Sequence, residues 1–250
     1  MYRFICAAIL TLSGTAADAM NEISHGTYFI YSKTDRHIIA SIDSRVVVSP
    51  TNFRDDFCKL IVLNSNLFSL AAGITGLATN GRADFDIYDI IRAESSRAPT
   101  EVAKNVITKF LGRISSPPSD LRTGDFTDVF LFDDLESLRV TIGHLDWGPS
   151  KVDMTVGTPA PFNRTSGHEE LFDEFFNLRT DRAKDMHQKI QGRFGATTDA
   201  ERLAAIFTGV VQAVVTFGND PKVGGEAQTI ILEKGKPLRW YARPGHCPEN

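Results

Sequence analysis

Residues 27–48 read TYFIYSKTDRHIIASIDSRVVV, and the first structural element can be derived from them. This stretch is dominated by β-branched and aromatic side chains, which favour strands over helices. A polar break at residues 33–36 separates two such runs, and this pattern predicts a hairpin. If the turn centres on the middle of that break, the hairpin register places Thr27 opposite Ile42 or Asp43.

A second hairpin is predicted directly downstream. Two apolar runs, residues 60–63 and 67–72, are separated by the turn-forming sequence Asn-Ser-Asn. The register of this hairpin sets Lys59 beside Ala71, two residues from Gly73. Each hairpin therefore brings polar or conformationally special residues to one of its ends.

The rest of the chain mixes helical and strand patterns. Apolar residues at helical spacing predict helices, and short apolar or alternating runs predict strands. Helices are expected over residues 84–92, 99–110, 168–191 and 199–216. Further strands are expected over residues 129–132, 138–145, 152–156, 227–232 and 238–241. Paired helices beside antiparallel strands indicate a layered α+β fold.

Composition favours a single large domain. The chain has 250 residues, of which 42% are hydrophobic, and this is enough for one full core. The formal net charge is −4, and the basic residues are not clustered. We therefore expect no nucleic-acid partner, because nucleic-acid binding requires a concentrated basic surface.

The N-terminus has the pattern of a secretory signal. Arg3 precedes an apolar run over residues 4–10, and Ala17-Asp18-Ala19 fits a small-x-small cleavage site. We expect residues 1–19 to be a signal peptide, and the mature protein to be secreted or periplasmic. Without a later run of about 18 apolar residues, no membrane association is expected after signal removal. The alternative is that Met20 is the true start of a cytoplasmic protein.

Two cysteines lie outside the expected signal peptide. Cys58 and Cys247 could form a disulfide in an oxidising compartment, or both could remain free thiols. The sequence leaves both alternatives open.

Four residues have a spacing that suggests a catalytic site. Thr27 follows Gly26, Asp43 and Lys59 come at successive intervals of sixteen residues, and Gly73 comes fourteen residues later. A threonine hydroxyl is a weak nucleophile that needs a base. A threonine at a chain N-terminus carries its own base, an α-amine with an ordinary pKa of about 7.7–8.0.

The other three residue types fit the needs of that nucleophile. A nearby lysine ammonium lowers the pKa of the amine by like-charge repulsion, and a carboxylate can hold the lysine in place. A glycine N–H can stabilise the oxyanion of a tetrahedral intermediate. Taken singly, however, Thr27, Asp43, Lys59 and Gly73 are ordinary residues of strands and turns.

Together these residues resemble the proteasome β-type subunit family, which belongs to the N-terminal-nucleophile (Ntn) hydrolases. The resemblance implies an α+β fold with a four-layer αββα sandwich of two antiparallel sheets between helix layers. It implies a short propeptide over residues 20–26 and a single Ntn-hydrolase-like domain over residues 27–250. Self-cleavage at the Gly26–Thr27 bond would free the threonine.

The resemblance also implies a function. The protein would be a threonine-type hydrolase of a peptide or small amide substrate, with no cofactor and a possible homo-oligomeric assembly. Thr27 would be nucleophile and base, Lys59 would tune it, Asp43 would orient Lys59, and Gly73 would supply the oxyanion donor. The alternatives are a non-catalytic binding or assembly module and a small-molecule amidase on the same fold.

The C-terminal half fits the family less closely. Ser166, followed by Gly167, and Asp220 resemble a supporting serine and aspartate of β-type subunits. Val223, however, stands where the family has a second serine that can donate a hydrogen bond.

Metal chemistry is not expected. His144 with Asp146, and His168 with the acidic residues 169–170, are the clusters that contain metal-ligand types. Their spacings fit no common metal site.

Overall fold

The computed structural model describes most of the expected domain. The described residues are 21–24, 27–49, 52–79, 82–94, 98–113, 126–147, 152–157, 164–166, 199–217 and 221–249. The expected signal peptide, the helix expected over residues 168–191, and Asp220 lie outside this part of the chain.

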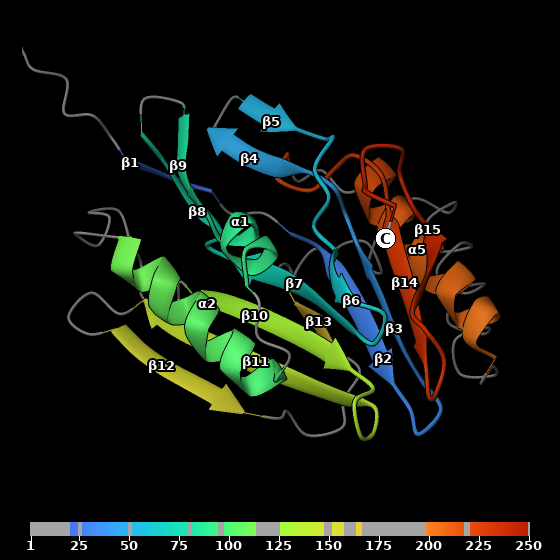
Figure 1. Cartoon of the computed structure of the whole chain (residues 1–250). Coiled ribbons are helices and arrows are strands. Elements are labelled where there is room, and N and C mark those ends of the chain that lie inside the picture. The colour runs from blue at the N-terminus through green and yellow to red at the C-terminus, as the bar shows by residue number, and fades with distance from the viewer. Residues whose placement is uncertain are drawn as a thin grey trace, which may run out of the picture.

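Two five-stranded antiparallel sheets form the body of the protein (Figure 1). One sheet has the order β12-β11-β10-β7-β6, with β6 (Ile61–Asn64), β7 (Leu67–Gly73), β10 (Phe126–Asp133), β11 (Arg139–Trp147) and β12 (Val152–Gly157). The other has the order β13-β2-β3-β14-β15, with β2 (Phe29–Lys33), β3 (His37–Ile42), β13 (Arg164–Ser166), β14 (Gln228–Glu233) and β15 (Arg239–Ala242).

Two smaller sheets lie beyond one end of this body (Figure 1). The first places β8 (Gly76–Thr79) between β1 (Asn21–Ser24) and β9 (Arg82–Asp86). The second pairs β4 (Val46–Ser49) with β5 (Asn52–Arg54).

Helices cover the outer faces of the two large sheets. Helices α1 (Ile87–Arg92) and α2 (Pro99–Arg113) pack on the sheet that contains β7 and β10, and α5 (Ala200–Phe217) packs on the sheet that contains β3 and β14 (Figure 1). Successive side chains of β10 point to opposite faces of the sheet. Val129 and Leu131 pack toward the helices, whereas Phe130 and Phe132 pack between the sheets. The prediction of a mixed α+β fold with antiparallel sheets is confirmed.

An aromatic core holds the two sheets together. The ring of Phe29 lies 4.9 Å from that of Phe130, and the ring of Tyr31 lies 5.3 Å from that of Phe132, each pair edge to face. All four side chains are buried. Burial of such a side chain contributes about 1.5–3 kcal/mol, so these pairs fix how β2 lies over β10.

Most predicted elements are present, with corrections at three places. The run expected as one strand over residues 38–48 is two strands, β3 and β4, interrupted at residues 43–45. The interruption has a local cause, because the Asp43 side chain accepts the backbone N–H of Arg45. The helix expected over residues 84–92 begins only at Ile87, since the preceding residues pair with β8.

The third correction concerns the first hairpin. Its turn lies about one residue later than predicted, because the Thr34 hydroxyl accepts the backbone N–H groups of Arg36 and His37 and closes a four-residue loop. Asp43 consequently lies beside Tyr28 instead of Thr27. The second hairpin has the predicted register, with Ile61 opposite Ser69.

A disulfide links Cys58 to Cys247 across 189 residues of sequence, with a Cα–Cα distance of 5.1 Å. Of the two alternatives that the sequence left open, the structure shows the paired one. The bond anchors the C-terminal tail to the segment that precedes β6.

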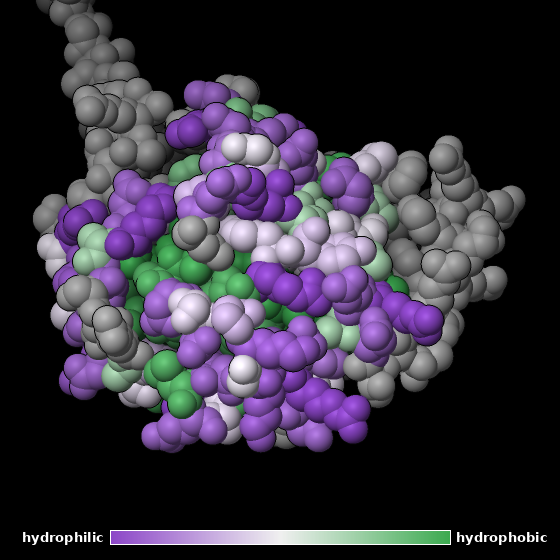
Figure 2. Space-filling model, turned by 45° about the vertical axis from the view of Figure 1, so that its right-hand side comes forward, coloured by the Kyte–Doolittle hydropathy of each residue, from purple (hydrophilic) through white to green (hydrophobic). Residues whose placement is uncertain are grey.

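One face of the molecule is mostly polar. Figure 2 shows a face on which hydrophilic residues predominate and apolar residues are recessed between them. Within the described ranges, no helix is both long and apolar enough to cross a membrane.

Candidate active site

Three of the four residues at the predicted spacing meet at one end of the sandwich. The Lys59 Nζ lies 3.0 Å from Asp43 Oδ1 and 3.2 Å from Thr27 Oγ1. All three side chains are buried. The lysine therefore donates to the threonine hydroxyl while the aspartate holds the lysine.

Strand ends position these side chains. Thr27 lies two residues before β2, Asp43 follows β3 directly, and Lys59 lies two residues before β6. The first two belong to one large sheet and the third leads into the other. The cluster thus joins the two sheets at their shared end.

Gln228 on β14 fastens the lysine segment to the other sheet. Its side-chain oxygen accepts the backbone N–H of Lys59 at 2.9 Å and of Leu60 at 3.1 Å. Its side-chain nitrogen donates to the Phe57 carbonyl at 2.5 Å. Sequence reasoning missed this positioning residue and could not explain why the two hairpins meet. A glutamine inside the otherwise apolar strand expected over residues 227–232 was the available signal.

Both carboxylate oxygens of Asp43 accept hydrogen bonds. Oδ1 accepts from Lys59 Nζ and from the Tyr28 N–H at 2.9 Å, and Oδ2 accepts from the Arg45 N–H at 3.2 Å and the Gly224 N–H at 3.3 Å. Burial raises the pKa of Asp43, and these partners oppose that effect. Burial likewise lowers the pKa of Lys59, against the attraction of Asp43. The result is a lysine that gives up its proton more readily than an ordinary lysine.

The loop before β14 supports Asp43 through its backbone. Val223, where the β-type family has a serine, is buried against the helix α5 core, and the neighbouring Gly224 donates its N–H to Asp43. Arg45 braces this loop by donating to the Pro221 carbonyl and by a bidentate ion pair with Asp55, at 2.6 and 2.8 Å. This loop therefore supports Asp43 through the backbone of Gly224 and not through the side chain at position 223.

Gly73 occupies a position that only glycine fits. Its φ is +81°, and a Cβ there would overlap the carbonyl oxygen of Phe126. In the antiparallel pairing of β1 with β8, Ser24 lies opposite Gly76. Thr27 is three residues after Ser24, and Gly73 is three residues before Gly76. Gly73 itself pairs with Thr127 on β10.

The two expected helpers have different outcomes. Ser166 lies on β13, where its backbone pairs with Phe29, two residues from Thr27. The structure therefore brings the backbone of Ser166 to the first residue of β2, the strand that follows the threonine. Asp220 lies outside the described residues.

His144 has a different partner from the one that its sequence neighbours suggested. Its Nδ1 lies 2.6 Å from Oδ1 of the buried Asp128 on the adjacent strand, whereas Asp146 was the partner considered from sequence. Asp128 precedes Phe130 by two residues, as Thr27 precedes Phe29, and the two phenylalanines are in contact. This histidine–aspartate pair therefore belongs to the same end of the sandwich as Thr27.

Among the residues that the structure describes, no group of three or more histidine, cysteine, aspartate or glutamate side chains could hold a metal ion. His168 and its acidic neighbours lie outside those residues.

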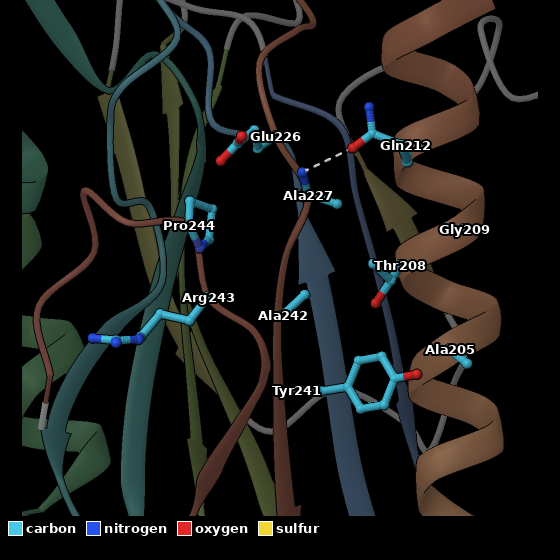
Figure 3. Close-up of a pocket in the computed structure, with 10 residues that line it drawn as sticks. All are labelled: Ala205, Thr208, Gly209, Gln212, Glu226, Ala227, Tyr241, Ala242, Arg243 and Pro244. Atoms are coloured by element: carbon cyan, nitrogen blue, oxygen red, sulfur yellow. Dashed lines mark hydrogen bonds between the residues drawn. The ribbon is translucent and has the colours of Figure 1, made fainter.

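A separate pocket lies between helix α5, the residues just before β14, and the end of β15 with the two residues that follow it (Figure 3). Its volume is about 560 Å³, and small residues such as Gly209 and Ala242 line it together with Tyr241. Gln212 closes one side by accepting the Ala227 N–H at 3.4 Å. None of the residues of the threonine cluster lines this pocket.

Comparison with known proteins adds no relative. A scan against protein-family models finds no match, and a search of curated proteins finds none. Inference about function therefore depends on the site itself.

Proposed function

We propose that the protein is a threonine-type Ntn hydrolase with the four-layer αββα fold of proteasome β-type subunits, and that it activates itself by cutting the Gly26–Thr27 bond. The observation that carries this proposal is the 3.2 Å contact between a buried lysine ammonium and the Thr27 hydroxyl. The helices on the two outer faces of the paired sheets agree with it.

The proposed reaction begins at the free N-terminus of Thr27. The α-amine takes the hydroxyl proton as Oγ1 attacks the substrate carbonyl, and the Gly73 N–H stabilises the oxyanion. The α-ammonium of Thr27, formed in this step, then protonates the leaving amine. The acyl part of the substrate remains as an ester on Thr27 Oγ1. Water attacks this ester with the amine again as base, which releases the acid and restores Thr27.

Lys59 and Asp43 set the electrostatics of these steps. The positive charge of Lys59 lowers the pKa of the threonine amine, so that more of it is neutral and able to accept a proton near pH 7. Asp43 keeps the lysine in place through the 3.0 Å ion pair. Without Lys59, the Thr27 hydroxyl would lose the ammonium group that lies 3.2 Å from it.

Trapping with a peptide α′,β′-epoxyketone tests the proposed function. The threonine hydroxyl adds to the ketone and the amine opens the epoxide, so that a stable adduct requires an N-terminal threonine. We expect one adduct at Thr27 in the wild type and none in Thr27→Ala. Absence of an adduct in a processed, folded wild type would favour the non-catalytic module instead.

We also propose that the protein works outside the cytoplasm, either secreted or in a periplasm. The Cys58–Cys247 disulfide and the signal-like N-terminus both agree with an oxidising compartment. Cell fractionation followed by mass spectrometry of the disulfide-linked peptides tests this. Recovery of the folded protein in the cytoplasm with both thiols free would contradict it.

A further inference from the structure

A histidine–aspartate pair on the sheet that carries Gly73 has no role in the proposed reaction. Nδ1 of His144 lies 2.6 Å from Oδ1 of Asp128, and the Asp128 side chain is 2% exposed whereas that of His144 is 42% exposed. A carboxylate can only accept a hydrogen bond, so Nδ1 carries the proton and Nε2 of the neutral ring is an acceptor. In the part of the chain that the structure describes, Nε2 has no hydrogen-bond partner.

A second carboxylate lies on the same face of strand β11. Successive residues of a strand point to opposite faces. Ile142 packs against the core between the sheets, whereas Leu145 and Trp147 pack toward the helices. His144 and Asp146 therefore continue the face that carries Ile142, beyond the aromatic core. Asp146 is exposed, and none of the described residues forms an ion pair with it.

The aromatic ring of Phe126 completes this group of side chains. In the register of β10 with β11, Phe126 lies opposite Asp146 and Asp128 lies opposite His144. The ring centroid of Phe126 is 6.3 Å from that of His144, and the two ring planes are 26° apart. A carboxylate, an imidazole acceptor and an aromatic ring are thus gathered on one patch of two neighbouring strands.

This patch lies close to the proposed oxyanion donor. Strand β10 lies between β7 and β11 (Figure 1), and Gly73 on β7 pairs with Thr127, the residue between Phe126 and Asp128. Neighbouring strands are about 4.8 Å apart, so the backbone of His144 lies about 10 Å, or two strands, from that of β7. A side group of a molecule held at Gly73 can therefore reach the patch.

All three available groups of the patch favour an organic cation. The Asp146 carboxylate attracts positive charge, and Nε2 of His144 accepts a hydrogen bond from an ammonium or guanidinium group. The face of an aromatic ring such as that of Phe126 also attracts cations. A bare metal ion fits less well, because no three ligand-type side chains converge on one point among the described residues.

We propose that Phe126, His144 and Asp146 bind an alkylammonium or guanidinium group, and that this site selects substrates that carry such a group near the amide to be cut. The second part rests on the proposed function and names its substrate class, whereas the first part does not depend on it. Asp128 is a positioning residue, since it holds the His144 tautomer that presents an acceptor.

Binding is tested on the full-length protein with butylguanidinium as the probe and butanol as the neutral control. The nitrogen chemical shift of His144 Nε2, assigned with His144→Gln, reports on the site. We expect a saturable shift with butylguanidinium alone, and an affinity at least about threefold weaker in Asp146→Asn. Glu101→Gln, which removes an exposed carboxylate from helix α2, is the matched control and should bind as the wild type does. No shift, or an equal shift with butanol, would overturn the site.

Substrate selection is tested by the rate of Thr27 labelling in the processed protein. Tripeptide epoxyketones of alanine would carry one lysine at each position in turn, and each would be compared with norleucine, which lacks the charge. We expect one position at which the lysine probe reacts at least about fivefold faster. This ratio should approach one in Asp146→Asn and His144→Gln but not in Glu101→Gln. Equal rates at every position would overturn the selection of cationic substrates.

The two experiments separate failure of this proposal from failure of the proposed function. Binding of butylguanidinium by a protein that no epoxyketone labels would support the cation site and contradict the hydrolase. Labelling of Thr27 by a protein that does not bind butylguanidinium would support the hydrolase and overturn the cation site.

Discussion

The Nζ of Lys59 lies 3.0 Å from Oδ1 of Asp43, and the two side chains are 1% and 0% exposed. Burial of such a pair costs desolvation energy that the mutual attraction often fails to offset. Stability alone therefore does not explain why the pair is present. The second contact of the lysine, at 3.2 Å from the Thr27 hydroxyl, provides a functional reason.

Replacement of Lys59 should separate function from stability. Lys59→Met leaves the Asp43 carboxylate buried without its cation, and we expect a loss of about 3–5 kcal/mol in unfolding free energy together with loss of Thr27 labelling. The double variant with Asp43→Asn should regain much of the stability but no labelling. Urea denaturation and epoxyketone trapping measure the two effects.

Lys33→Met, at the far end of β2, is the matched control. It should change neither the unfolding free energy nor the labelling of Thr27 appreciably. Labelling of Lys59→Met at the wild-type rate would remove the lysine from the proposed mechanism.

Gly73 should tolerate no side chain. Gly73→Ala places a Cβ against the Phe126 carbonyl at a positive φ, and we expect a loss of about 1–3 kcal/mol in unfolding free energy. Gly112→Ala is the control: it lies in helix α2 with open space around the added Cβ, and it should stabilise the protein by up to about 1 kcal/mol. Chemical denaturation of both variants compares them. Equal stability of Gly73→Ala and the wild type would contradict the close approach to Phe126.

The pH dependence should show a lysine with a lowered pKa. Because burial lowers the pKa of Lys59, its charge is lost below the usual lysine value of about 10.4. Labelling of Thr27 should therefore fall on the alkaline side before ordinary lysines titrate. A decline that begins only above that value would contradict a lowered pKa.

The contribution of Lys59 to folding stability changes with pH in the opposite direction to the labelling of Thr27. Between the folded pKa of Lys59 and its unfolded pKa, the unfolded chain binds a proton that the folded chain lacks. Folding stability from this group therefore rises with pH across that window. The decline in labelling should occur without unfolding, and Lys59→Met should lack the rise in denaturation measurements made over the same pH range.

The disulfide should contribute stability and anchor the tail. Cys247→Ser removes the covalent link between two residues that are 189 positions apart in the sequence. We expect a loss of about 2–5 kcal/mol in unfolding free energy. Thermal unfolding with and without a reductant measures this. Reduction should destabilise the wild type and leave Cys247→Ser unchanged. Equal midpoints for the oxidised and reduced wild type would contradict a structural role.

Local pattern predicted much of the fold. Strong apolar periodicity located helices α2 and α5, and β-branched runs located both N-terminal hairpins. Errors arose where a side chain competes with the backbone ladder. Asp43 and Thr34 each capture backbone N–H groups, which breaks the strand expected over residues 38–48 and shifts the first turn. Such competition depends on geometry that residue type alone does not specify.

The candidate site, like the fold, could be predicted only in part from the sequence. The resemblance to the β-type family singled out Thr27, Asp43 and Lys59 by their spacing. Strand register explains the approach of Asp43 to the Thr27 end within the first hairpin, but it does not bring Lys59 from the second hairpin to them. Spacing could not identify Gln228, which acts from a strand 169 residues after Lys59. Nor could it identify Asp128 as the partner of His144, since cross-strand pairing between β10 and β11 brings them together.

The most direct test of self-activation is the N-terminal sequence and intact mass of the mature wild-type protein, measured beside Thr27→Ala. We expect a wild-type chain that begins at Thr27 and a folded variant that retains the leader from residue 20. A mature wild-type chain that begins at Met20 would leave Thr27 without a free amine and would contradict the hydrolase proposal. Loss of the leader in Thr27→Ala would contradict self-cleavage.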